Sequence, residues 1–127
     1  MNREIKFRIW NSLNDTMTYP DRYCFDWSWF GVSTEHYLDD SAGVYPIDES
    51  VYKLMQFTGL QDKNGKDIYE GDIIRDNEYI LIIVWDNTYC SFCLDRKGWM
   101  YRHWFGESCD PKDCEIIGNV HQNPELL

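Results

Sequence analysis

Four of the five cysteines in this 127-residue chain lie after residue 89, at spacings that could serve a metal ion. Cys90-Ser-Phe-Cys93 is followed by Cys109 and Cys114, and a structural zinc site needs four such ligands in a tetrahedron. However, Cys90 and Cys93 fall within a predicted strand, where a separation of three places them on opposite faces. No glycine follows the pair to shape a zinc knuckle. We therefore expect buried free thiols and no metal or cofactor, with zinc on these four cysteines as the weaker alternative.

The histidines and serines give no clear catalytic pattern. His36, His103 and His121 are scattered, and no serine has the flanking glycines of a nucleophile elbow. Cys109 could pair with His103 only if the fold brought them together, and His103 is equally well explained as a surface residue of a strand. No helix is predicted to begin at the Cys-x-x-Cys pair, whereas a redox thiol needs a helix N-terminus to lower its pKa. We therefore expect no catalytic residue and no enzyme activity.

Residues 23–52 combine large aromatic rings with acidic side chains and contain no lysine or arginine. One interpretation is an irregular loop whose rings cover the core while the acids face water. The other is a protein-binding surface, because Trp and Tyr anchor interfaces and carboxylates steer a basic partner. The sequence does not decide whether these rings are buried or exposed. The candidate partner-binding residues are Asp26, Trp27, Trp29, Phe30, Asp39, Asp40, Asp48 and Glu49.

The net charge of −10 excludes several classes of function. An acidic chain repels nucleic-acid backbones and anionic membranes, so we expect neither direct nucleic-acid binding nor membrane binding. The polar start of the chain does not fit a secretory signal. The longest apolar run, Tyr79 to Trp85, has seven residues, far fewer than the roughly 20 that span a bilayer. We therefore expect a cytoplasmic protein with reduced cysteines.

Short strands and tight turns dominate the predicted secondary structure. Residues 5–10 alternate apolar and polar side chains, as in a half-buried strand, and with a return strand at 16–19 they predict an N-terminal hairpin. Residues 33–39 could form a short helix with Ser33 or Thr34 as its N-cap. Residues 78–85 are almost continuously apolar, which predicts a central strand buried on both faces. Further strands are predicted at 52–58, 67–69, 73–75, 88–94, 99–105 and 114–121.

The clearest turn signal is Asn64-Gly65, which predicts a type I′ hairpin because both central positions of that turn need a positive φ. Aromatic residues make up 17% of the chain and can supply the core of a small β-rich fold. We predict a mainly β fold (α+β at most) with little helix. Its C-terminal half should form a small SH3-like barrel, on which the N-terminal hairpin lobe packs. We expect one domain, 1–127, with sub-lobes of roughly 1–52 and 53–127.

Three segments resemble the YopX family of phage and prophage proteins. They are Arg3-Glu-Ile-Lys-Phe-Arg-Ile-Trp10, the hairpin block from Leu54 to Ile74, and the terminal Ile116-Ile-Gly-Asn-Val-His-Gln-Asn-Pro-Glu-Leu-Leu127. Asn11 stands where the family often has Asp. The resemblance implies a β-rich fold, an origin in a phage or prophage, and residence in the bacterial cytoplasm. It implies no known active site, and we interpret matched residues such as Asp72 as structural, here the start of a strand after a turn.

These observations predict an accessory protein, encoded by a phage or prophage, that acts through protein–protein contacts with a host or phage partner. Its biochemical activity is unknown. One alternative is an acidic nucleic-acid mimic that inhibits a host nucleic-acid-binding or defence protein, since carboxylates can imitate phosphate spacing. Others are a self-assembling structural protein, which would be a homo-oligomer, and a zinc protein with cysteine ligands.

Overall fold

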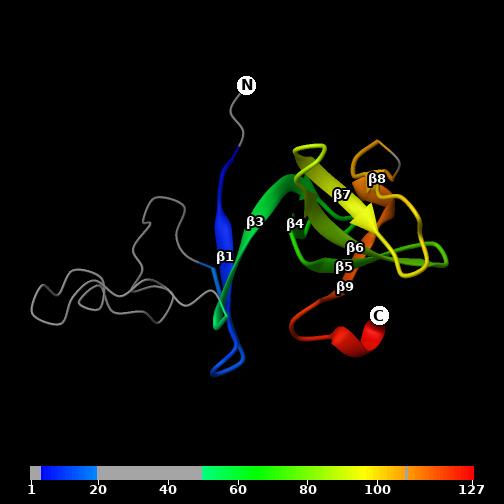
Figure 1. Cartoon of the computed structure of the whole chain (residues 1–127). Coiled ribbons are helices and arrows are strands. Elements are labelled where there is room, and N and C mark those ends of the chain that lie inside the picture. The colour runs from blue at the N-terminus through cyan, green and yellow to red at the C-terminus, as the bar shows by residue number, and fades with distance from the viewer. Residues whose placement is uncertain (1–3, 20–49, 108) are drawn as a thin grey trace, which may run out of the picture. The chain divides into compact units, whose positions relative to one another are not determined.

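The computed structural model describes residues 4–19, 50–107 and 109–127 (Figure 1). These residues are mainly β, as predicted. Their only helical elements are two 3-10 turns, η2 (Pro111–Asp113) and η3 (Pro124–Leu126). The predicted helix at 33–39 lies outside the described residues. Within them, no helix is long and apolar enough to cross a membrane.

The chain divides into two compact units, residues 5–55 and residues 1–4 with 56–127. In the N-terminal unit, β1 (Phe7–Asn11) pairs antiparallel with β2 (Thr16–Thr18), which confirms the predicted hairpin. β3 (Tyr52–Gln61) starts in this unit and continues into the other. The division into sub-lobes at residue 52 within a single domain stays a prediction.

The predicted alternation along the first strand is wrong. Residues 8–11 are all buried, and the Arg8 side chain, expected to face water, is only 3% exposed. Its Nη2 lies 3.7 Å from the Sδ atom of Met55 in the same unit. In the sheet, β1 lies between β2 and β3. Burial of the whole side chain goes beyond the usual case, in which an arginine keeps its charged end in water.

The C-terminal unit contains a five-stranded sheet in the order β8-β7-β6-β5-β9 (Figure 1). All neighbouring strands are antiparallel. The bounds of the elements are β4 (Asp67–Tyr69), β5 (Asp72–Asp76), β6 (Tyr79–Asp86), β7 (Ser91–Asp95), β8 (His103–Trp104) and β9 (Glu115–Asn119). β4 pairs with β3. The more specific likeness to an SH3 barrel stays a prediction.

One buried cluster of this unit lies on one side of the five-stranded sheet. Ile74 is paired with Leu81, and Ile83 with Leu94, so these four side chains point the same way. All four are at most 3% exposed. Ile68, Cys109 and Cys114 complete this buried cluster, and Phe92, Trp99, Phe105 and Ile116 pack against it.

β6 is the central strand, as predicted, but the predicted burial on both faces is wrong, because Ile80, Ile82 and Val84 on one face are only half-buried. The other face is buried only in its middle. Leu81 and Ile83 are buried, whereas Tyr79 and Trp85 are 51% and 40% exposed. The two exposed rings lie at or next to the ends of the strand, beside the turns that connect it to β5 and β7. The apolar run of the sequence indicated the strand but could not show that its ends extend beyond the packed core.

Two predicted strands are shorter in the structure because side chains hold the adjoining loops. β7 begins only at Ser91, because the Asp86 carboxylate accepts the backbone N–H groups of Thr88 and Tyr89 at 2.8 and 3.1 Å. The predicted strand 99–105 is reduced to the two residues of β8. Its preceding loop is fixed by Arg102, which bonds both Asp86 and Asp95.

The turn at Asn64-Gly65 is a hairpin turn, but the predicted type I′ geometry is wrong. Gly65 has a φ of 76°, whereas Asn64 is not among the residues with positive φ. The Gly65 N–H donates to the Asp62 carbonyl at 3.0 Å, which closes a turn around Lys63 and Asn64. The arrangement matches the longer hairpin in which a left-handed glycine follows a type I turn.

Candidate functional site

The candidate partner-binding surface of the N-terminal half cannot be placed in the structure. All eight of its residues fall in the range 20–49, outside the described residues. Their role therefore stays a prediction. They are Asp26, Trp27, Trp29, Phe30, Asp39, Asp40, Asp48 and Glu49.

The four cysteines considered as zinc ligands do not converge. Cys90 lies exposed in the turn before β7, with its Sγ 3.6 Å from the carbonyl oxygen of Asn87. Cys93 is buried in β7. The only group in the described parts of the chain that could hold a metal ion joins Cys109 and Cys114 to Asp76. Sequence spacing could not indicate Asp76, which is 33 residues from Cys109.

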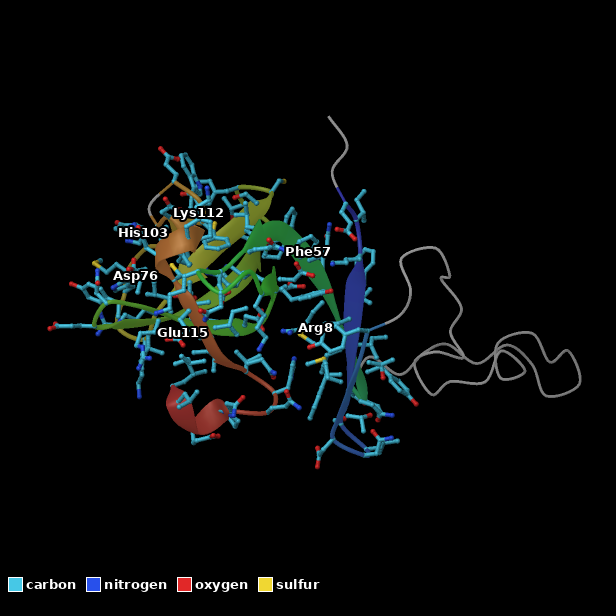
Figure 2. All side chains as sticks on the ribbon, turned by 180° about the vertical axis from the view of Figure 1, so that it is seen from behind. Arg8, Phe57, Asp76, His103, Lys112 and Glu115 are labelled. Carbon is cyan, nitrogen blue, oxygen red and sulfur yellow. The ribbon has the colours of Figure 1, made fainter. Side chains whose placement is uncertain are left out.

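Asp76, Cys109 and Cys114 form a tight cluster, which we call the acid–dithiol cluster. Asp76 is the last residue of β5 (Figure 2), and its Oδ2 lies 3.3 Å from the Cys109 Sγ. The backbone carbonyl oxygen of Asp110 lies 3.3 Å from the Cys114 Sγ and 3.8 Å from the Cys109 Sγ. The three side-chain ligand atoms all lie within 4.8 Å of one another.

A single turn of 3-10 helix brings the two sulfurs together. Asp110 caps η2, its side chain accepting the Lys112 N–H at 3.0 Å, and Pro111 occupies the first position, where no N–H is needed. The Cys114 N–H then donates to the Pro111 carbonyl at 3.1 Å. These bonds reverse the chain between the two cysteines, so that both side chains reach the edge of the core.

The surroundings of the two thiols keep them protonated in the absence of a cation. Burial raises the pKa of the Cys109 thiol, and the neighbouring Cys114 and Asp76 raise it further. Burial also raises the pKa of the Cys114 thiol, and the carboxylates of Asp76, Asp113 and Asp110 add to this effect. A raised pKa leaves less of the thiolate, which is the nucleophilic form of a cysteine.

His103 is not part of this cluster. It is exposed in β8, as predicted, and its ring packs against Trp99 at a centroid distance of 4.5 Å. The structure therefore supports the interpretation of His103 as a surface residue. The metal-binding group contains no histidine from the described parts of the chain.

Two carboxylates of the hairpin block have structural roles. The Asp62 side chain, 5% exposed, accepts the N–H groups of Asn64 and Lys66 at 2.9 Å and that of Ile116 at 3.0 Å. Burial raises the pKa of Asp62, but these three bonds outweigh it, so the pKa falls below its ordinary value. Asp72 begins β5 and accepts the Tyr69 N–H at 2.8 Å, which confirms the role predicted for it.

The terminal block forms a second hydrogen-bonded structure. The Asn119 Oδ1 accepts the N–H groups of His121 and Gln122 at 3.1 and 2.9 Å. The Asn123 side chain bonds back to the Asn119 N–H at 3.2 Å. A Cβ on Gly118 would lie 2.5 Å from the Asn123 Oδ1, so only glycine fits there. These residues fix the path of the tail.

A second candidate site is an exposed group of large side chains near β8. Tyr89, Met100, Tyr101 and Trp104 are 56%, 87%, 76% and 48% exposed, and we call them the aromatic edge. The Tyr89 and Trp104 rings contact each other edge to face at a centroid distance of 5.8 Å. β8 is the end strand of its sheet, so the aromatic edge lies where a sheet could accept a further strand.

The fold and these sites define a mainly β protein whose recognisable motifs are structural. The chain belongs to the YopX protein family, whose model matches residues 6–127. It is similar to the crystal structure of protein EF1440 from Enterococcus faecalis, with a TM-score of 0.56 and 24% sequence identity, over 97% of each chain. At this identity the likeness shows a shared fold. A comparison with curated proteins found no match.

Proposed function

We propose that this YopX family member is a non-enzymatic accessory protein of phage or prophage origin that binds another protein through the aromatic edge. The observation that carries the proposal is the exposure of Tyr89, Met100, Tyr101 and Trp104, with the Tyr89 and Trp104 rings in contact with each other. Tyrosine, tryptophan and methionine are enriched in protein interfaces relative to the remaining surface. Large exposed apolar groups of this kind mark interaction sites in soluble proteins.

The charge of the chain favours a basic partner. Of the net charge of −10, six negative charges come from residues 23–52, where no lysine or arginine balances them. Such a segment accelerates encounter with a positively charged protein, whereas the rings supply the affinity once the surfaces meet. A host protein that normally binds nucleic acid has a positively charged surface. The nucleic-acid mimic is therefore a special case of the proposal.

The test is capture from the lysate of the bacterial host on immobilised protein, with the captured protein identified and its binding measured with purified components. The edge variant carries Tyr89→Ser and Trp104→Ser. Its control is Leu13→Ser, which removes a 77% exposed apolar side chain from the N-terminal unit. We expect the edge variant to lose at least tenfold in affinity, as for residues that anchor an interface, and the control to bind as wild type.

The contribution of charge is tested with two variants of equal net charge. The acid variant carries Asp39→Asn, Asp40→Asn, Asp48→Asn and Glu49→Gln. The control variant carries the same number of changes at exposed positions elsewhere, namely Asp15→Asn, Glu78→Gln, Glu107→Gln and Glu125→Gln. We expect the acid variant to slow association more than the control does at low salt. Equal binding by the edge variant and wild type would overturn the proposal.

The end position of β8 also favours a second candidate, self-assembly. β8 pairs with β7 on one side and has no further strand beyond it among the described residues. An end strand can pair with the same strand of another copy. Sedimentation of the purified protein distinguishes the candidates, because a defined oligomer that Trp104→Ser dissociates would assign the aromatic edge to self-contact.

A further inference from the structure

The acid–dithiol cluster has the composition and spacing of a metal site. Thiolates and carboxylates are common zinc ligands, with bonds of about 2.3 and 2.0 Å, so a tetrahedral site would place a sulfur and an oxygen roughly 3.5 Å apart. The distance from the Cys109 Sγ to the Asp76 Oδ2 is 3.3 Å. The Asp110 carbonyl oxygen lies 3.3 and 3.8 Å from the two sulfurs. These three distances suit a metal site, and the three side-chain ligand atoms all lie within 4.8 Å of one another.

The charges around the cluster also favour a cation. Asp76, Asp110 and Asp113 place three carboxylates near the sulfurs, and their negative charge acts on the Cys114 thiol. Lys112 is the only basic residue of η2, and its backbone N–H donates to the Asp110 side chain. Cys109 and Cys114 are 5% and 0% exposed, so the bound ion would be partly shielded from water, which strengthens its attraction to the ligands.

We propose that Asp76, Cys109 and Cys114 bind one thiophilic divalent cation, with zinc as the best fit. Zinc suits a mixed set of sulfur and oxygen ligands, and it has no geometric preference of its own that would conflict with this arrangement. On binding, the ion replaces the two thiol protons, which pass to the solvent. The fourth ligand would be either the Asp110 carbonyl oxygen or a water molecule.

The site would have a structural role. It joins the end of β5 to the loop that leads into β9, two segments that are far apart in the sequence. A metal ion that cross-links such segments stabilises the fold by its binding free energy. The cluster shares no residue with the aromatic edge, so the two proposals stand or fall separately.

The test uses the full chain, reduced and stripped of metal, and titrated with cobalt as a spectroscopic substitute for zinc. We expect one equivalent to bind with the thiolate-to-metal absorption of cysteine ligation, and zinc to displace it. The double variant Cys24→Ser, Cys90→Ser is the matched control and should bind as wild type. Cys109→Ser and Cys114→Ser should weaken binding at least about tenfold, since even the partners of metal ligands contribute that much.

Asp76→Asn keeps the experiment decisive if a buried cysteine variant fails to fold. This variant should keep the sulfur-to-metal absorption but bind more weakly than wild type, and circular dichroism confirms that each variant is folded. Absence of stoichiometric metal in the reduced wild type would overturn the proposal, as would unchanged binding by folded Asp76→Asn and Cys114→Ser. A disulfide between Cys109 and Cys114 in the freshly isolated protein, with no metal bound after reduction, would also overturn it.

Discussion

Asp62 and Asp76 both follow strand residues in the C-terminal unit, but their surroundings differ. The Asp62 carboxylate accepts three backbone N–H groups, from Asn64, Lys66 and Ile116. The Asp76 carboxylate faces the Cys109 thiol, a weak donor, with a second thiol nearby. The first carboxylate has its acceptor capacity used by the fold, whereas the second has capacity left for a positive charge.

The comparison teaches how to separate structural carboxylates from carboxylates that could bind an ion. A buried charge that is matched by backbone donors joins the elements that carry those donors, here the hairpin turn and β9. A half-buried charge beside soft, uncharged donors is only partly compensated, and such sites are candidates for ion binding. The number and type of donors therefore distinguish the two cases better than burial alone.

The largest expected effect is on the stability of an Asp62→Ala variant. Three backbone N–H groups would lose their acceptor, and because a buried unsatisfied donor costs about 1–3 kcal/mol, we expect a loss of about 3 kcal/mol. Asp76→Ala in the metal-free protein should lose about 1 kcal/mol, because only one weak thiol bond is removed. Urea unfolding measures both. An equal or larger loss for Asp76→Ala would show that the two carboxylates do not differ as described.

The next effect is stabilisation by zinc. If the acid–dithiol cluster binds the ion, a free zinc concentration of 100 times Kd should add about 2.7 kcal/mol to the free energy of unfolding. Thermal unfolding with and without zinc measures it. Asp62→Asn should respond to zinc as wild type does, whereas Asp76→Asn should respond only at higher zinc concentration. Equal responses from the two variants would contradict the assignment of the ion to Asp76.

A smaller effect concerns the dependence of stability on pH. Because the pKa of Asp62 is lowered in the folded chain, its contribution is fully present above its unfolded pKa of about 4. It is lost as the pH falls through the lower folded pKa. Asp62→Asn should therefore lose less stability than wild type between pH 5 and pH 2. Urea unfolding across this range checks the slope, and identical slopes would mean that the Asp62 charge is not linked to folding.

The smallest effect is expected for Glu115→Gln. Glu115 forms ion pairs with Arg75 at 3.0 Å and Lys63 at 3.6 Å, and the Arg75 side chain is the main cause of its lowered pKa. All three side chains are open to solvent, which screens such pairs. The variant should differ slightly from wild type at low salt and not at high salt. A loss of stability as large as that of Asp62→Ala would show that these ion pairs stabilise the fold as much as the buried hydrogen bonds of Asp62 do.

Local patterns predicted most of the described fold. Runs of apolar residues and turn residues located the hairpins at 7–18 and 72–86, and Asp72 was correctly assigned to the start of a strand. The misassigned details depended on neighbours that are distant in sequence. Arg8 is buried and contacts Met55, 47 residues further along the chain, and β8 is short because Arg102 holds the preceding loop on Asp86 and Asp95.

The sequence by itself determined a mainly β, acidic YopX chain with a hairpin turn at Asn64-Gly65, because these features depend on composition and on residues a few positions apart. Only the tertiary structure decided which cysteines meet. Cys90 and Cys93 matched a zinc spacing yet point to different surroundings, whereas Asp76 joins Cys109 and Cys114 from another strand. The physical reason is that the ligands of a site must come together in space. Pairing between strands far apart in the sequence brings them together, and no local pattern records that pairing.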